Sequence, residues 1–247
     1  MTNSGEAATP RPQRKHRSIL IETLLLVVIA LVVAVVLKTF FVQAFYIPSP
    51  SMVPGLVKDD RILVEKPSYW AGEPQRGDVV VFEDPGHWLP DEDSGPVGPV
   101  ATLLSKIGLY PTGGHLVKRV IGVGGDTIVC CDDQGRISVN GQPLDEDDYV
   151  NEPETSPCRG PRGPGGDCSW TAGPVPDGDL FVMGDNRYDS DDSSAHMCSP
   201  DDTACVPGQE FFSQDLVVGK VFAVMLPRDH ATWLHRPDTF ADVPDAP

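Results

Sequence analysis

Basic residues are scarce in this sequence: 19 lysines and arginines stand against 36 aspartates and glutamates, and the net charge is −17. A protein that binds nucleic acid needs a basic face to neutralise phosphates, so this balance argues strongly against such a partner. Helical periodicity is also scarce outside one apolar stretch, whereas 25 prolines and 24 glycines punctuate the chain. The composition therefore favours short strands and turns over a helical bundle.

The six cysteines include no Cys-x-x-Cys pair and no nearby Cys/His quartet, so a zinc site is disfavoured and we expect no metal and no cofactor. They suit an oxidising exterior, in which disulfides persist. Their connectivity cannot be deduced from the sequence, although Cys158 with Cys168 and Cys198 with Cys205 would close short loops. Cys130 and Cys131 are adjacent, and on a strand their side chains would point to opposite faces.

One apolar stretch of membrane length, residues 19–42, contains only Glu22 and Lys38 as charged residues. As a helix it would span about 36 Å, enough for a bilayer core of about 30 Å with both charges reaching the interfaces. The basic cluster in the polar segment 1–18 predicts a cytoplasmic N-terminus and an extracytoplasmic remainder. We therefore interpret residues 19–42 as a transmembrane anchor in a bacterial plasma membrane.

A cleaved secretory signal is the alternative, because it also has a basic start and an apolar run. Its apolar region is shorter, about 7–15 residues, and ends at small residues. Here Phe40, Phe41, Phe45 and Tyr46 follow the run, which is typical of an aromatic interface anchor. An uncleaved anchor is the preferred interpretation.

The remainder, residues 43–235, alternates apolar runs with turn signals and is predicted to be a mostly β, antiparallel domain. Asn140-Gly141 is a strong signal for a two-residue turn between short strands. Residues 85–114 and 145–178 look like loop-rich insertions on this scaffold, and the tail 236–247 is predicted to be disordered. The expected strands are 61–65, 79–83, 115–123, 127–131, 136–139, 180–183 and 217–225.

Ser51 lies just beyond the predicted anchor, in Pro48-Ser49-Pro50-Ser51-Met52-Val53-Pro54. Serine is a poor nucleophile until a base removes its proton, and Lys118, beside Val117 and Val120, could do so if burial lowers its pKa. To act near pH 7, that pKa must fall from about 10.4 toward 7–8. A serine at the membrane face with a lysine base suggests hydrolysis of a substrate that arrives through the membrane.

Four motifs in this order resemble the bacterial type I signal peptidases, or leader peptidases. They are the serine motif 48–54 after the anchor, Asp60-Arg61-Ile62-Leu63-Val64, Lys118-Arg119-Val120-Ile121-Gly122, and Gly184-Asp185-Asn186-Arg187 followed by Ser190 and Asp192. Each motif is weak alone, but four in this order after an anchor are specific. The resemblance covers roughly residues 40–225.

The resemblance implies a membrane-anchored serine endopeptidase that removes signal peptides from exported preproteins. It implies that Ser51 is the nucleophile and that Lys118 is the general base, which later acts as the acid. Ser49 would contribute an oxyanion-hole hydroxyl beside the backbone N–H of Ser51, and Ser190 would orient the lysine.

Supporting roles are expected for three charged residues. Arg119 has no role as a base, so we expect it to pair with an acid such as Asp185, and Asp192 would support the site. The chain also departs from the family pattern: Gly55 stands where threonine is usual, Gly124 where proline is frequent, and Ser194 where arginine often follows the aspartate.

The implied substrates are preproteins with small residues at the −1 and −3 positions of the cleavage site, and the lipid bilayer is the second implied partner. Trp70 and Trp88, with residues 100–109, either rest on the bilayer or pack in the core. Candidates for the lining of the substrate pockets are Ile47, Met52, Val53 and Leu116.

A Ser-His-Asp triad built on His115 or His196 is a weaker alternative. The sequence has no Gly-x-Ser-x-Gly elbow, and His115 would face the opposite side of a strand from Lys118. Two further functions fit the sequence less well. A self-cleaving repressor with a Ser/Lys pair is disfavoured by the anchor and by the lack of a preceding DNA-binding segment. A non-enzymatic membrane-tethered scaffold would not need Ser51 and Lys118 together.

Overall fold

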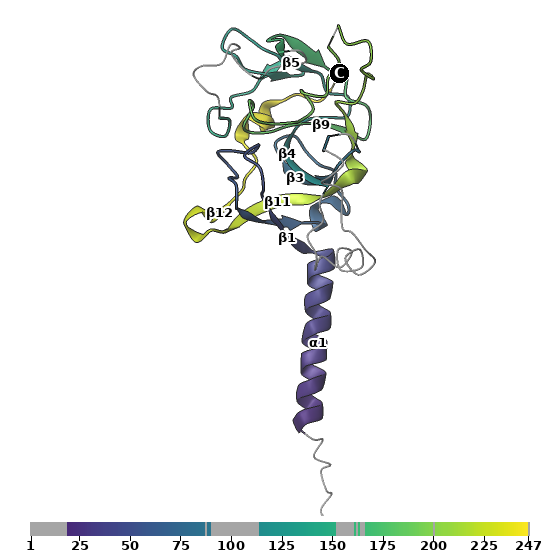
Figure 1. Ribbon diagram of the computed structural model, residues 1–247, viewed down its shortest axis with the longest axis vertical. Coiled ribbons are helices and arrows are strands. Elements are labelled where there is room, and N and C mark those ends of the chain that lie inside the picture. Colours follow the sequence, from purple (N-terminus) through teal and green to yellow (C-terminus); the bar gives the residue numbers. More distant parts are fainter. Residues whose placement is uncertain are drawn as a thin grey trace, which may run out of the picture.

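The computed structural model describes residues 19–86, 88–89, 114–151, 161, 163, 166–199 and 201–246. The predicted cytoplasmic segment 1–18, most of the insertion 85–114 and Cys158 lie outside these residues. The described chain is a mostly β body from which one N-terminal helix projects (Figure 1). This is the predicted fold class.

Helix α1 (Ile19–Phe40) is long and apolar enough to cross a membrane, and none of residues 19–36 is buried against the rest of the protein. It ends before the predicted limit at residue 42, because strand β1 (Val42–Tyr46) begins there. Phe41 O already accepts a hydrogen bond from Lys66 N–H, and Val42 pairs with Glu65 of the next strand. The last residues of the apolar run therefore belong to the sheet rather than to the helix.

Within the described residues, the main sheet has eight strands, and all its pairs are antiparallel. Their order is β1-β2-β11-β3-β4-β9-β10, with β12 paired to β11. The late strand β11 thus lies between two early strands. The strands predicted at 61–65, 79–83 and 115–123 are confirmed at these bounds. The remaining members after β1 are β2 (Arg61–Glu65), β3 (Val79–Glu83), β4 (His115–Val123), β9 (Asp179–Met183), β10 (Phe212–Ser213), β11 (Val217–Leu226) and β12 (Thr232–Trp233).

A second, four-stranded sheet has the order β7-β6-β5-β8 and lies at the end of the body away from α1 (Figure 1). The predicted turn at Asn140-Gly141 connects β6 to β7, and φ is 52° and 81° at these two residues, as such a turn requires. Strand β8 lies inside the predicted insertion 145–178 and was missed. The strands are β5 (Ile128–Cys130), β6 (Ser138–Val139), β7 (Gln142–Pro143) and β8 (Trp170–Ala172).

The disulfide between Cys198 and Cys205 is confirmed. Cys168 is also disulfide-bonded, but its expected partner lies outside the described residues. Cys130 and Cys131 are bonded to each other, so the expectation that they point apart is wrong. The reason is that β5 ends at Cys130, and strand alternation no longer applies to the next residue.

The buried apolar residues of the part of the chain that the structure describes form three clusters. One lies between the second sheet and β9, one joins the chain after β1 to β2 and β11, and one lies around β3, β4 and β10. Trp88 is 2% exposed and belongs to the third cluster, which decides between its two predicted positions in favour of the core. Trp70 is 58% exposed, and its ring contacts that of Phe41 at the end of α1.

The C-terminal tail is ordered through residue 246, so the prediction of disorder from residue 236 is wrong. A 3-10 helix, Asp238–Asp242, buries Phe240, and Val243 is buried beyond it. Arg236 donates to Asp78 at 2.8 Å. Two buried apolar side chains and one ion pair thus hold this segment on the body, although its composition is acidic and rich in proline.

Candidate active site

The serine loop, residues 47–60, leaves β1 and places apolar side chains in the core. Met52 and Leu56 are 2% and 0% exposed, in the cluster shared with β2 and β11. Val53 N–H donates to Pro50 O at 3.1 Å, and Leu56 N–H donates to Met52 O at 2.9 Å. Ser51 is therefore fixed on a tight turn whose flanking side chains are packed.

The hydroxyl oxygens of Ser49 and Ser51 lie 3.2 Å apart. Both residues are in the same turn, and Ser51 is 7% exposed. A hydroxyl at this distance is near any oxyanion that forms on a carbonyl attacked by Ser51. The two hydroxyls are therefore neighbours, and the oxyanion role of Ser49 stays a prediction.

The two ends of the serine loop meet at Ile47 and Asp60. Ile47 N–H donates to Asp60 O at 2.9 Å, and the Asp60 carboxylate accepts the N–H of Val57 at 2.8 Å. This carboxylate is fully buried, and His230 Nδ1 lies 3.0 Å from each of its oxygens. A residue on the connection between β11 and β12 thus contacts the base of the loop.

Lys118 lies on β4, opposite Val80 of β3, and is 3% exposed. Burial lowers its pKa below the ordinary lysine value, because the charged form is poorly solvated there. Four carboxylates act in the opposite direction, and Asp192 is the strongest of them. Within the described residues, Lys118 forms no salt bridge, so burial prevails and the direction suits a general base.

Gly184 is the point at which the parts of the site meet. Because Arg119 pairs with Met183 in the β4–β9 ladder, Lys118 and Gly184 follow side by side. A Cβ atom on Gly184 would lie 2.4 Å from Ser51 O and 2.3 Å from Ser190 Oγ. Only a residue without a side chain permits this close approach of the serine loop and Ser190.

The segment after β9 also holds the serine loop through its backbone. Asn186 N–H donates to Ser51 O at 3.0 Å, and its side-chain amide donates to Pro50 O at 3.2 Å. Ser190 donates its hydroxyl hydrogen to the Asp192 carboxylate at 2.6 Å. The hydroxyl of Ser190 is therefore oriented by Asp192 and keeps its lone pairs for another donor.

Arg119 and Asp185 form the expected ion pair, with two hydrogen bonds of 2.8 and 2.6 Å between side chains that are 6% and 1% exposed. A second buried pair, Arg187 with Glu146, was missed, although Arg187 lies within a recognised motif. Tyr149 connects the pairs: its ring lies under Arg119, and its hydroxyl donates to Glu146 at 2.7 Å. Burial and the Glu146 charge raise the pKa of Tyr149, which keeps it a neutral donor.

The histidines and the other candidate residues lie as follows. His115 and Lys118 are an odd number of residues apart on one strand, so they face opposite sides as expected. His196 lies 3.1 Å from Asp191 and stacks on Trp88. The candidate pocket residues Ile47, Met52 and Leu116 are buried in the clusters, whereas Val53 is half-buried.

A model of the signal peptidase family, peptidase S26, matches residues 20–226 of the chain. The chain belongs to this family. Signal peptidase I of Mycobacterium tuberculosis strain H37Rv is 41% identical over 221 residues, which are 81% of this chain and 71% of the relative. The probable signal peptidase I of Mycobacterium leprae is 39% identical over 218 residues, or 80% and 71%. The crystal structure of a signal peptidase I from Enterococcus faecalis V583 is 25% identical, with a TM-score of 0.35, and covers 60% of this chain and 96% of that chain.

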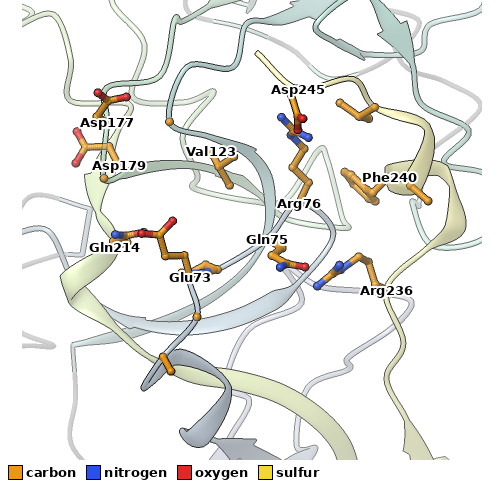
Figure 2. Close-up of a pocket in the computed structure, with 17 residues that line it drawn as sticks. Glu73, Gln75, Arg76, Val123, Asp177, Asp179, Gln214, Arg236, Phe240 and Asp245 are labelled. Carbon is orange, nitrogen blue, oxygen red and sulfur yellow. The ribbon is translucent and has the colours of Figure 1, made fainter. Parts of the chain in front are cut away.

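The protein is therefore a serine peptidase of the signal peptidase I family, and the site above is its candidate active site. A cavity of about 900 Å³ lies elsewhere on this peptidase, between the chain after β2 and the C-terminal tail (Figure 2). Arg76 and Arg236 line it, each paired with a buried carboxylate, Asp126 and Asp78. It is not lined by Ser49, Ser51, Lys118 or Ser190.

Proposed function

We propose that this signal peptidase hydrolyses preproteins with Ser51 as nucleophile and Lys118 as general base. The observation that carries the proposal is the convergence at Gly184, where Ser51 O and Ser190 Oγ approach the neighbour of Lys118. Burial of Lys118 supports it further, because the lowered pKa favours the neutral amine that a base requires.

In the proposed reaction, neutral Lys118 removes the hydroxyl proton of Ser51, and Ser51 Oγ attacks the scissile carbonyl carbon. The Ser49 hydroxyl and the Ser51 backbone N–H stabilise the negative oxygen of the tetrahedral intermediate. The Lys118 ammonium then gives its proton to the leaving amine, and an acyl-enzyme remains. Lys118 next takes a proton from water, whose oxygen attacks the ester carbonyl. When the tetrahedral intermediate collapses, the Lys118 ammonium returns this proton to Ser51 Oγ, which releases the acid product and regenerates both groups.

We further propose that α1 spans the plasma membrane, with segment 1–18 in the cytoplasm and the β body outside. Ser51 follows α1 by one short strand and a turn, which keeps the site close to the bilayer from which signal peptides emerge. The exposed pair Trp70 and Phe41 at the end of α1 suits the interface. The near burial of Ser51 favours substrates with small side chains at −1 and −3.

The test is cleavage of a purified preprotein by the full-length, detergent-solubilised protein. Ser51→Ala and Lys118→Ala should each lower kcat by about 10⁴-fold or more. Lys118→Arg should be equally inactive, because arginine stays protonated. Matched controls are Ser138→Ala on β6 and Lys220→Arg on β11, which change the same residue types away from the serine loop and should cleave normally. Cleavage at the parental rate by Ser51→Ala or Lys118→Arg would overturn the proposal.

A further inference from the structure

Asp192 is a buried carboxylate that is satisfied entirely by uncharged donors. It is 1% exposed, and within the described residues it forms no salt bridge. Oδ2 accepts from Gly184 N–H at 2.9 Å and from Ser190 Oγ at 2.6 Å. Oδ1 accepts from Ser194 twice, from its N–H at 3.0 Å and from its hydroxyl at 2.8 Å.

The two oxygens of the Asp192 carboxylate thus accept hydrogen bonds from different parts of the chain. Oδ2 faces the site, where Ser190 and Gly184 lie, and Oδ1 is held from behind by Ser194 alone. Ser194 is itself 6% exposed, so water has little access to replace its hydroxyl. We propose that Ser194 is a positioning residue that fixes the Asp192 carboxylate and, through it, the direction of the Ser190 hydroxyl toward Lys118. This inference rests on the proposed role of Lys118 as the base.

The direction of the Ser190 hydroxyl matters because a neutral lysine amine has two N–H donors and one lone pair. Ser190 has one hydrogen, and Asp192 takes it. Ser190 can then only accept an N–H from Lys118, which leaves the amine lone pair for the proton of Ser51. If Asp192 turned away, Ser190 could donate to that lone pair and block the base.

Ser194 also moderates the negative charge that faces Lys118. Asp192, Asp191, Asp185 and Asp189 all act on the lysine. Asp185 is paired with Arg119, and Asp191 lies against His196, whereas Asp192 has only neutral donors. Its charge opposes the lowering of the pKa of Lys118 most strongly. Two donors from Ser194 at Oδ1 draw part of that charge away from the lysine.

The test compares Ser194→Ala with Ser194→Thr, which keeps the hydroxyl, in the full-length protein acting on a purified preprotein. For Ser194→Ala we expect kcat to fall about tenfold, with KM unchanged because Ser194 does not contact substrate. In a plot of kcat against pH, the fall on the acidic side (the acid limb) should move up by about half a pH unit. The reason is that Asp192 without the two donors from Ser194 stabilises protonated Lys118 more strongly. Ser194→Thr should restore both values.

Ser193→Ala is the matched control. Ser193 is fully buried, and its hydroxyl accepts the N–H of Val182, so its loss destabilises the neighbouring chain without changing the donors of Asp192. It should leave the acid limb in place. Cysteine is nearly equal to serine in size and is a weak donor, so Ser194→Cys should show a smaller shift of the acid limb than Ser194→Ala. It replaces Ser194→Ala in the test if that variant does not fold.

A parental kcat and acid limb in Ser194→Ala would overturn the inference, as would an equal shift in Ser193→Ala or a change confined to KM. If Ser51→Ala or Lys118→Arg stays active, the proposed function itself fails. If these two are inactive while Ser194→Ala behaves as the parent, only the inference on Ser194 fails.

Discussion

Two of the segments that form the site, the serine loop and residues 184–194, are held in opposite ways. The serine loop is fixed by apolar side chains, of which Met52 and Leu56 are almost completely buried. The segment 184–194 is fixed by buried charges instead, including Asp185, Arg187 and Asp192. The comparison indicates that Ser51, the proposed nucleophile, is placed by apolar packing, whereas the surroundings of Lys118, the proposed base, are set by charge. Substitutions in the serine loop should therefore destabilise the protein through lost packing, and substitutions in segment 184–194 through unpaired buried charge.

The largest effect is expected from breaking a buried ion pair. Arg119→Met leaves the Asp185 carboxylate buried without its partner, so the free energy of unfolding should fall by about 3–5 kcal/mol. Chemical denaturation of the solubilised protein measures it. Replacing both residues, as Arg119→Met with Asp185→Leu, should recover much of the loss, because no unpaired charge remains. An equal loss in the double variant would contradict the assignment of the effect to charge.

The serine loop should lose stability through packing. Met52→Ala and Leu56→Ala each remove a buried side chain and should cost about 2–4 kcal/mol of unfolding free energy. The two differ in function: Met52 adjoins Ser51, so kcat should fall more for Met52→Ala than for Leu56→Ala. Unfolding curves and cleavage rates of both variants provide the comparison. Equal rates would show that packing next to Ser51 does not position the nucleophile.

Lys118→Met should abolish cleavage but raise the free energy of unfolding by roughly 1–2 kcal/mol at neutral pH, since it removes a buried amine that forms no salt bridge within the described residues. The gain depends on pH. Unfolded lysine titrates near about pH 10.4, and the folded pKa of Lys118 is lower. Burial of the charge therefore costs most below the folded pKa, and the cost fades as pH rises through this window. Unfolding measured across pH should show the gain shrinking toward pH ~10.4, and a constant gain would contradict it.

The smallest effect should come from breaking an arginine–aspartate ion pair at the surface. Arg136 and Asp132 form a salt bridge of 2.7 Å, but both side chains are substantially exposed. Water and salt weaken such a pair. Arg136→Ala should leave Tm and cleavage unchanged, as thermal unfolding and the preprotein assay would show. A loss comparable to that of Arg119→Met would remove burial as the explanation of the difference.

Much of the framework could be read from the sequence, because strong local patterns specify it. Short runs rich in valine, isoleucine and leucine and bounded by turn residues placed β2, β3 and β4 at their observed bounds. Strand β1 was hidden because its residues continue the apolar run of α1, and only pairing with β2 separates them. Strand β8 is three residues long in a stretch rich in glycine and proline, so no periodicity marks it.

In the site, motifs indicated the residues but not their partners. The pairing of Arg119 with Asp185 was foreseen because each lies in a recognised motif. Glu146 was missed because it lies among Asp145, Asp147 and Asp148, and nothing local distinguishes the one carboxylate that Arg187 buries. Ser194 was noted only as a departure from arginine, since its two hydrogen bonds to Asp192 depend on the folded chain.

The central position of β11 has a consequence for how the chain folds during its synthesis. Residues 217–226 separate β2 from β3, and His230 follows to contact Asp60 at the base of the serine loop. A growing chain that already carries the anchor, Ser51 and Lys118 still lacks the strand that joins them. Such long-range pairing forms late, after most of the chain is available. A chain that lacks residues 217–230 therefore has neither the strand that joins β2 to β3 nor the histidine that contacts the base of the serine loop.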